Sequence, residues 1–152
     1  MSSLIFIAKL NLFDLLKKIV KKIFIPREVY NELVFKDAPE IATVDKELGG
    51  FVEIVDIDAE IKGELDHGEK AAISLCLKKK IKIFLSDDNK ARKYALSRGL
   101  EVIGVIGIIL ELNRKKHIKK DEAEKLMIDL INHGHFMSPR LYSEVMQLIK
   151  DK

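Results

Sequence analysis

Short apolar runs alternate with amphipathic segments along most of the chain. Runs of β-branched and aromatic residues predict strands, and apolar positions three and four apart predict helices. The expected strands are 22–25, 51–57, 82–85 and 101–105. The expected helices are 11–20, 27–35, 40–48, 70–79, 89–97, 108–116, 121–132 and 139–151.

Residues 4–10 form the first apolar run of the chain. The run is nearly all apolar and partly β-branched, so the pattern alone allows a short buried strand over 4–8.

Strands that alternate with helices predict a parallel sheet covered on both faces. The three helices expected after residue 107 form a helical tail. A length of 152 residues suits one domain, 1–152, and the composition, 47% hydrophobic and 34% charged, is that of a globular protein. The net charge of +3 permits nucleic-acid binding without indicating it.

One cysteine, Cys76, excludes an internal disulfide, and its apolar, helix-like surroundings predict a buried structural thiol. No cleavable signal is present, and no apolar run is long enough to cross a bilayer. We therefore expect a soluble, cytoplasmic protein without a membrane partner.

Acidic residues stand at three junctions between elements, where function gathers in open α/β sheets. They are Glu32, Glu69 and the adjacent pair Asp87 and Asp88. Each has an ordinary structural interpretation. Asp66 and Glu69 fit a capping box, Asp87 or Asp88 fits a helix cap, and Glu32 fits a solvent-facing helix position.

Together, these carboxylates indicate a cation site. Clustered carboxylates repel one another unless a cation lies among them, and hard oxygen ligands suit Mg²⁺ or Mn²⁺. Such a metal activates water and stabilises charge on a phosphate. Arg92 follows Asp88 by one helical turn, close enough to neutralise a carboxylate or to bind a phosphate.

Four segments in this order resemble the PIN-domain superfamily, in the branch with Gly-Glu and Asp-Asp-x-x-Ala-Arg motifs. The start of the chain, MSSLIFIAKLNLFDLL, also resembles that branch, so the resemblance covers almost the whole chain. The four segments are IPREVYNEL (25–33), LDHGEKAAISL (65–75), FLSDDNKAR (84–92) and GLEVIGVIGIIL (99–110).

The resemblance implies a Rossmann-like α/β/α sandwich and a metal-dependent ribonuclease. VapC-like toxins of toxin–antitoxin pairs are the best-known members, so RNA and a protein antitoxin are the implied partners. The catalytic residues and ligands of Mg²⁺ or Mn²⁺ would be Glu32, Glu69 and Asp88, with Asp87 as a further metal ligand. The resemblance also places Ser2, Ser86 and Arg92 at the substrate.

One family feature has no counterpart in the sequence. Family members carry a first acidic ligand at the end of a first, central strand, which here would lie before Met1. Either the chain begins late or it lacks a ligand. Without that strand, residues 22–25 and 82–85 would pair directly or use 4–8 as a substitute, although the resemblance favours a helix for 4–8. An unpaired edge also favours a homodimer.

Two functions follow from these alternatives. One is the ribonuclease, and the other is a catalytically inactive module that binds RNA or protein. An unrelated α/β enzyme such as a phosphatase would need a nucleophile motif that the sequence lacks.

His133 and His135 are spaced like zinc ligands but have no matching third ligand, which favours a helix end. His67 fits a surface loop as well as a phosphate contact.

Overall fold

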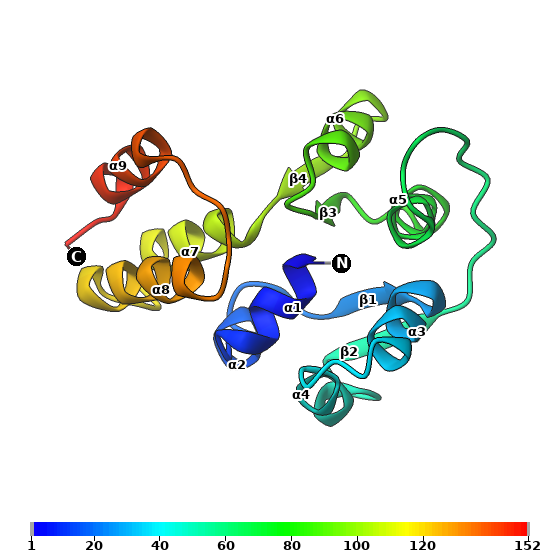
Figure 1. Cartoon of the computed structure of the whole chain (residues 1–152), viewed down its shortest axis with the longest axis horizontal. Coiled ribbons are helices and arrows are strands. Elements are labelled where there is room, and N and C mark those ends of the chain that lie inside the picture. The colour runs from blue at the N-terminus through cyan, green and yellow to red at the C-terminus, as the bar shows by residue number, and fades with distance from the viewer. Residues whose placement is uncertain (1, 152) are drawn as a thin grey trace.

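The computed structural model describes residues 2–151, apart from the side chain of Ser2, and confirms the predicted α/β class with a helical C-terminus (Figure 1). Its strands are β1 (Ile23–Pro26), β2 (Val52–Val55), β3 (Ile83–Leu85) and β4 (Glu101–Ile103). Its helices are α1 (Ser2–Lys9), α2 (Phe13–Leu16), α3 (Arg27–Phe35), α4 (Ile41–Glu47), α5 (His67–Lys79), α6 (Asn89–Ser97), α7 (Val105–Arg114), α8 (Lys120–Asn132) and α9 (Pro139–Leu148).

The first apolar run is a helix, α1, as the resemblance favoured. The prediction of one helix over 11–20 is wrong, because α2 covers only four residues. Asn11 interrupts the helical backbone between α1 and α2. Its φ is +55°, a left-handed conformation that asparagine tolerates. After Leu16 the backbone closes tighter turns, with the amides of Lys18 and Ile19 bonded three residues back.

The strands form two separate two-stranded parallel sheets. β1 pairs with β2, with Ile25 opposite Ile54, and β3 pairs with β4, with Phe84 opposite Val102. Within residues 2–151, β1 and β3 are not hydrogen-bonded to each other, and no substitute strand joins them. The expectation that they would pair directly, or through residues 4–8, is therefore wrong. In Figure 1, α1 begins between the two sheets.

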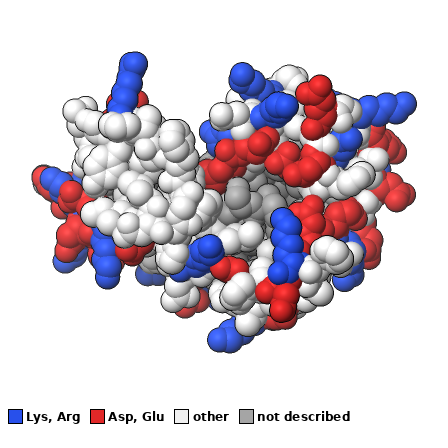
Figure 2. Space-filling model, in the orientation of Figure 1, with Lys and Arg blue, Asp and Glu red and all other residues white. Residues whose placement is uncertain are grey.

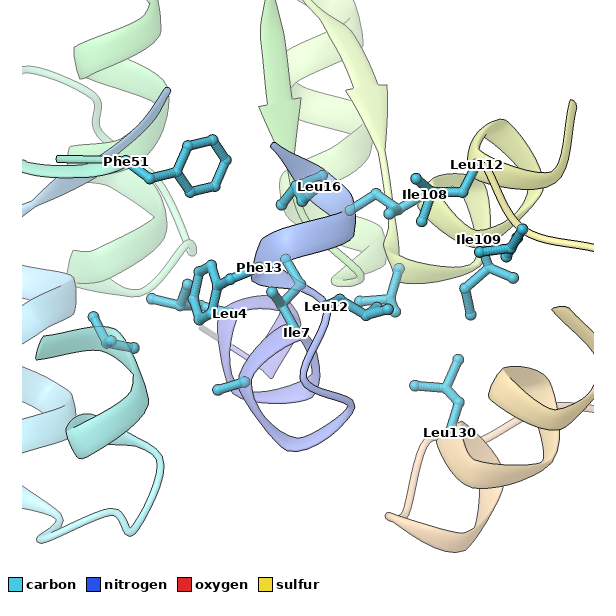
Figure 3. Close-up of a cluster of buried hydrophobic side chains, with 14 of the residues drawn as sticks. Leu4, Ile7, Leu12, Phe13, Leu16, Phe51, Ile108, Ile109, Leu112 and Leu130 are labelled. Atoms are coloured by element: carbon cyan, nitrogen blue, oxygen red, sulfur yellow. The ribbon is translucent and has the colours of Figure 1, made fainter. Parts of the chain in front are cut away.

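The larger of two hydrophobic cores joins α1 and α2 to α7, α8 and the β1–β2 sheet. Figure 3 shows Ile7 and Leu12 directed toward the same interior as Ile109 and Leu130. The smaller core contains six buried residues around the β3–β4 sheet: Ile73, Cys76, Phe84, Ala91, Ala95 and Leu100. Helix α5 packs against both β1 and β3, so it spans the two sheets.

Local signals set several element ends. Ser138 caps α9 by accepting from the Leu141 amide, and Gly99 ends α6 with φ +84°, a backbone conformation that suits glycine. β4 ends at Ile103, two residues earlier than predicted, because α7 already begins at Val105. No helix in residues 2–151 is both long enough and apolar enough to span a membrane.

Candidate functional site

The amino end of α5 carries the first of the predicted acidic residues. Asp66 is the cap, and its Oδ1 accepts a hydrogen bond from the Glu69 amide at 2.8 Å. The Asp66 backbone also acts on the Glu69 carboxyl as a hydrogen-bond partner that lowers its pKa, which is the return contact of the predicted capping box. Glu69 lines a cavity beside β1 and β3 as well.

Glu69 lies in an unfavourable place for a negative charge. Burial raises the pKa of its carboxyl above the usual value of 4.5, and the negative charges of Asp66 and Asp88 raise it further. Glu69 and Asp88, which are 19 positions apart in the sequence, are therefore close enough in space to repel each other.

Glu32 reaches the same helix end from α3. A methyl group at Gly68 would lie 3.1 Å from Glu32 Oε1 and 3.3 Å from Val29 Cγ2. Both contacts are tighter than ordinary, so the absence of a side chain at Gly68 allows α3 and α5 to cross closely. The crossing brings the Glu32 carboxylate to the turn that carries Glu69.

Asp88 is the cap of α6. Its Oδ2 accepts from the Ala91 amide at 2.9 Å, and its own amide donates to Ser86 Oγ at 3.1 Å. The structural interpretation of this residue is thus confirmed. The cap engages one carboxylate oxygen, and the exposed side chain still faces Glu69 closely enough to affect its pKa.

Asp87 has different partners from Asp88. Its Oδ2 accepts from Ser3 Oγ at 2.6 Å, and its Oδ1 accepts from the Val105 amide at 3.3 Å. His135 Nε2 lies 3.5 Å from the same Oδ1, and both side chains are more than four-fifths buried. Asp87 therefore joins the start of α1, the start of α7 and the loop after α8.

Arg92 is held on the other side of this network. Its Nη1 donates to the Ser86 carbonyl at 2.8 Å, and Ser86 is buried at 3% exposure. A methyl group at Gly104 would collide with Asp87 Oδ1 and lie 3.2 Å from Arg92 Nη1. Gly104 thus makes room for both side chains. The predicted substrate contacts of Ser86 and Arg92 remain predictions.

Two residues of this network were not among the predicted site residues. The sequence indicated Ser2, whose side chain lies outside the described residues, whereas its neighbour Ser3 bonds Asp87. His135 was interpreted as part of a helix end, but its ring contacts Asp87 and lies 5.2 Å from the Phe6 ring. His135 is 48 positions from Asp87, and no local pattern could reveal that contact.

A cavity of about 720 Å³ separates the two sheets, and we call it the slot. Residues of β1, β3 and α5 line it, together with residues of α1, α2 and α7. Glu69 and Ser86 lie at the end of the slot toward which β3 runs. Cys76 also lines the slot, and burial raises the pKa of its thiol to about 11, as expected of an inert structural cysteine.

The described residues do not by themselves fit a divalent metal. In residues 2–151, no three His, Cys, Asp or Glu side chains are grouped so that they could hold a metal ion. Glu69 and Asp88 offer suitable oxygens at one edge, but Asp87 is turned toward Ser3 and Val105. The acidic group is therefore incomplete as a metal centre.

Charge is distributed unevenly over the surface. Figure 2 shows Asp and Glu side chains gathered mainly on the side of this face where α3, α5 and α6 lie. The surface of the C-terminal helices in the same view is broadly uncharged. The acidic side of this face is the side on which the amino end of α5 lies.

Comparison with known proteins gives one positive finding. A family model described as a PIN domain (DUF3368) matches residues 1–151. No curated protein and no solved structure gives a significant match to the chain. The match covers nearly the whole chain, including all the acidic residues described above.

Proposed function

The chain belongs to the PIN-domain family, and from that premise we propose that it is a ribonuclease whose acidic centre is formed by Glu32, Glu69 and Asp88. PIN domains are typically nucleases that use divalent metals. The substrate proposed here is RNA, and the bond that is cleaved is a phosphodiester.

The observation that carries the proposal is the convergence of three carboxylates at the amino end of α5. Glu32 arrives from α3, Glu69 belongs to α5, and Asp88 precedes α6. Repulsion by Asp88 disfavours the charged form of Glu69, which is common where binding or catalysis requires a charged group. Because these residues do not complete a metal centre, the proposal requires a further ligand beyond those described.

The test is cleavage of a labelled RNA with Mn²⁺ by the chain and by Glu69→Gln and Asp88→Asn. Asparagine caps helices about as well as aspartate, so Asp88→Asn removes the charge while keeping the cap. We expect each variant to lose at least about 100-fold in rate, the order of magnitude of a lost catalytic group.

Asp58→Asn is the matched control for this experiment. Asp58 is exposed, and its carbonyl accepts from Lys78, near the other end of α5. Glu69 and Lys78 are nine residues apart on α5, about 14 Å along the helix. Equal cleavage by the chain and by all three variants would show that the activity does not belong to this centre.

A second function is favoured by the incomplete metal centre. A PIN-like module without catalysis would bind RNA or a protein partner through the same face. In that case RNA binding would be independent of Mn²⁺, and no product would form. A toxin role in a toxin–antitoxin pair, a dependence on Mg²⁺ or Mn²⁺, and a homodimer remain predictions from the resemblance.

A further inference from the structure

The amino ends of the strands form an edge of the molecule that the proposed function does not use. Val29 of α3 lies beside Gly68 at the amino end of α5, so β1, which runs directly into α3, points toward the acidic centre. β3 points the same way, because Asp88, three residues beyond it, lies near Glu69. The segments that precede β1 and β3 therefore lie at the edge opposite the acidic centre.

Lysines line two hollows at this opposite edge. One is a hollow of about 580 Å³ just ahead of β2, and the other is the end of the slot where β1 and β3 begin. Lys21 lines both, so the two hollows adjoin. We call the six lysines that line them the lysine edge: Lys17, Lys21, Lys22, Lys46, Lys82 and Lys115. Three glutamates line the same places, which leaves three positive charges: Glu47, Glu101 and Glu111.

Local structure does not account for all of this positive charge. Half of the lysine edge lies at the carboxyl ends of helices, where cations are favourable: Lys17, Lys46 and Lys115. Lys22 pairs with Glu53 at 3.3 Å. Lys21 and Lys82 are exposed, lie outside the helices and form no ion pair within residues 2–151. These two lysines have no structural partner that explains their position.

The chemistry of the lysine edge suits a chain of phosphates. Lysine ammonium groups bind phosphate as point charges, and a row of them follows a backbone better than it encloses one small anion. Phe51 and Phe84 are buried in the same hollows, and the Lys22 ammonium lies over the Phe24 ring. These three rings are therefore not open to a stacking base. Contacts to the backbone alone bind without sequence preference.

We propose that the lysine edge binds the phosphate backbone of an RNA strand outside the acidic centre. The choice of RNA as the polyanion rests on the proposed function, because that function already brings RNA to this protein. From Glu69 to Lys79, α5 spans ten residues, which is about 15 Å. The bond at the acidic centre and the phosphates at the lysine edge therefore belong to different parts of one RNA, and the lysine edge holds the RNA while the centre acts on it.

The test is binding of a labelled single-stranded RNA to the full chain in EDTA, measured by fluorescence anisotropy at several salt concentrations. EDTA removes divalent metals, so the result does not depend on cleavage. The variant Lys21→Gln/Lys82→Gln removes two charges from the lysine edge. Lys62→Gln/Lys125→Gln is the matched control, because both lysines are exposed and neither lines the two hollows.

We expect the lysine-edge variant to bind RNA about tenfold more weakly at about 0.15 M salt. Its slope of log affinity against log salt should fall by about 1.4, since each of two lost phosphate contacts contributes about 0.7. The control should bind within about twofold of the unmodified chain, because salt screens exposed charges far from the RNA. Bound RNA should also protect Lys21 and Lys82 from acetylation, read by mass spectrometry, and leave Lys62 and Lys125 reactive.

Two outcomes would overturn the proposal. One is equal affinity and equal salt dependence of the two double variants. The other is displacement of the RNA by oligoglutamate of equal charge as effectively as by unlabelled RNA, which would assign the lysine edge to an acidic polypeptide. RNA binding that depends on Lys21 and Lys82, without any cleavage in Mn²⁺, would support this proposal and contradict the nuclease.

Discussion

The two sheets have the same topology but pack against hydrophobic cores of different size. Each is a pair of short parallel strands, yet the β1–β2 sheet belongs to the larger core, together with α1, α2, α7 and α8. The β3–β4 sheet is backed by six buried residues, two of which are alanines in α6. Burial of apolar area supplies most of the stability of a fold, so the β3–β4 half is the weaker one.

The weaker half also carries most of the polar interactions of the candidate site. Asp87, Asp88 and Arg92 all follow β3, and Asp87 reaches Ser3 in α1 and His135 beyond α8. Leu85 of β3 and Ile103 of β4 also pack against the larger core, and the hydrogen bonds of Asp87 add polar contacts between the two halves. We infer that the geometry of the site depends on both kinds of contact.

Leu112→Ala should give the largest effect. Leu112 is fully buried in the larger core, and deletion of such a side chain costs about 2–5 kcal/mol. Urea unfolding should show this loss in a single transition, because the larger core supports both halves. Leu148→Ala is the control, since that side chain is 57% exposed and should change stability by less than about 0.5 kcal/mol. Retention of a folded β1–β2 half alone would contradict the comparison.

Gly104→Ala should break the connection between the halves. The added methyl group would displace Asp87 and Arg92, at a cost of about 1–3 kcal/mol for overpacking. Gly50→Ala is the control, because its methyl group would meet only the Glu47 carbonyl, at 3.9 Å. Equal unfolding midpoints for both variants would show that the Asp87 network does not hold the halves together.

Hydrogen exchange in the unmodified chain directly tests whether the β3–β4 half is less stable than the larger core. Amides of β3, β4 and α6 should open with a free energy at least about 1.4 kcal/mol lower than amides of α7 and α8, which is a tenfold faster exchange. Mass spectrometry of peptic fragments resolves these segments. Equal protection in the two halves would remove the distinction between them.

Asp88→Ala should destabilise the weaker half by about 1 kcal/mol, because the cap of α6 is lost. Asp88→Asn should keep most of that stability. Thermal unfolding of the two variants separates the cap from the charge. A loss as large for asparagine as for alanine would show that the negative charge, rather than the cap bond, stabilises this position.

Glu69→Gln should give the smallest effect and a distinctive pH dependence. The raised pKa means that the folded state binds the proton more tightly than the unfolded state, whose value is 4.5. The contribution of Glu69 to stability is therefore greatest below pH 4.5 and is lost as pH rises through its folded pKa. The variant should be slightly more stable than the chain at pH 7 and equal to it below pH 4.5. Urea midpoints of the unmodified chain and the variant should be measured across this pH range. If their difference does not change with pH, the raised pKa of Glu69 is contradicted.

The predictable part of the site was local. Asp66, Asp88 and Ser138 were identifiable as caps because a capping side chain bonds an amide three residues later in the same segment. The end of α2 was not predicted, since Lys17 to Val20 keep a helical pattern although the chain turns there. The contact between Ser3 and Asp87 joins residues 84 positions apart and leaves no periodic signal.

By itself, the sequence determined the alternation of strands and helices, the caps and the three acidic junctions. These features depend on hydrophobic period and on bonds within one turn, which neighbouring residues define. The tertiary structure decided which strands pair, that two sheets form instead of one, and that Asp87 and Asp88 have separate partners. Strand pairing and long-range hydrogen bonds depend on how whole elements pack. An unpaired strand edge can bond many different extended segments, and only the packing of the surrounding helices and strands decides which segment reaches it.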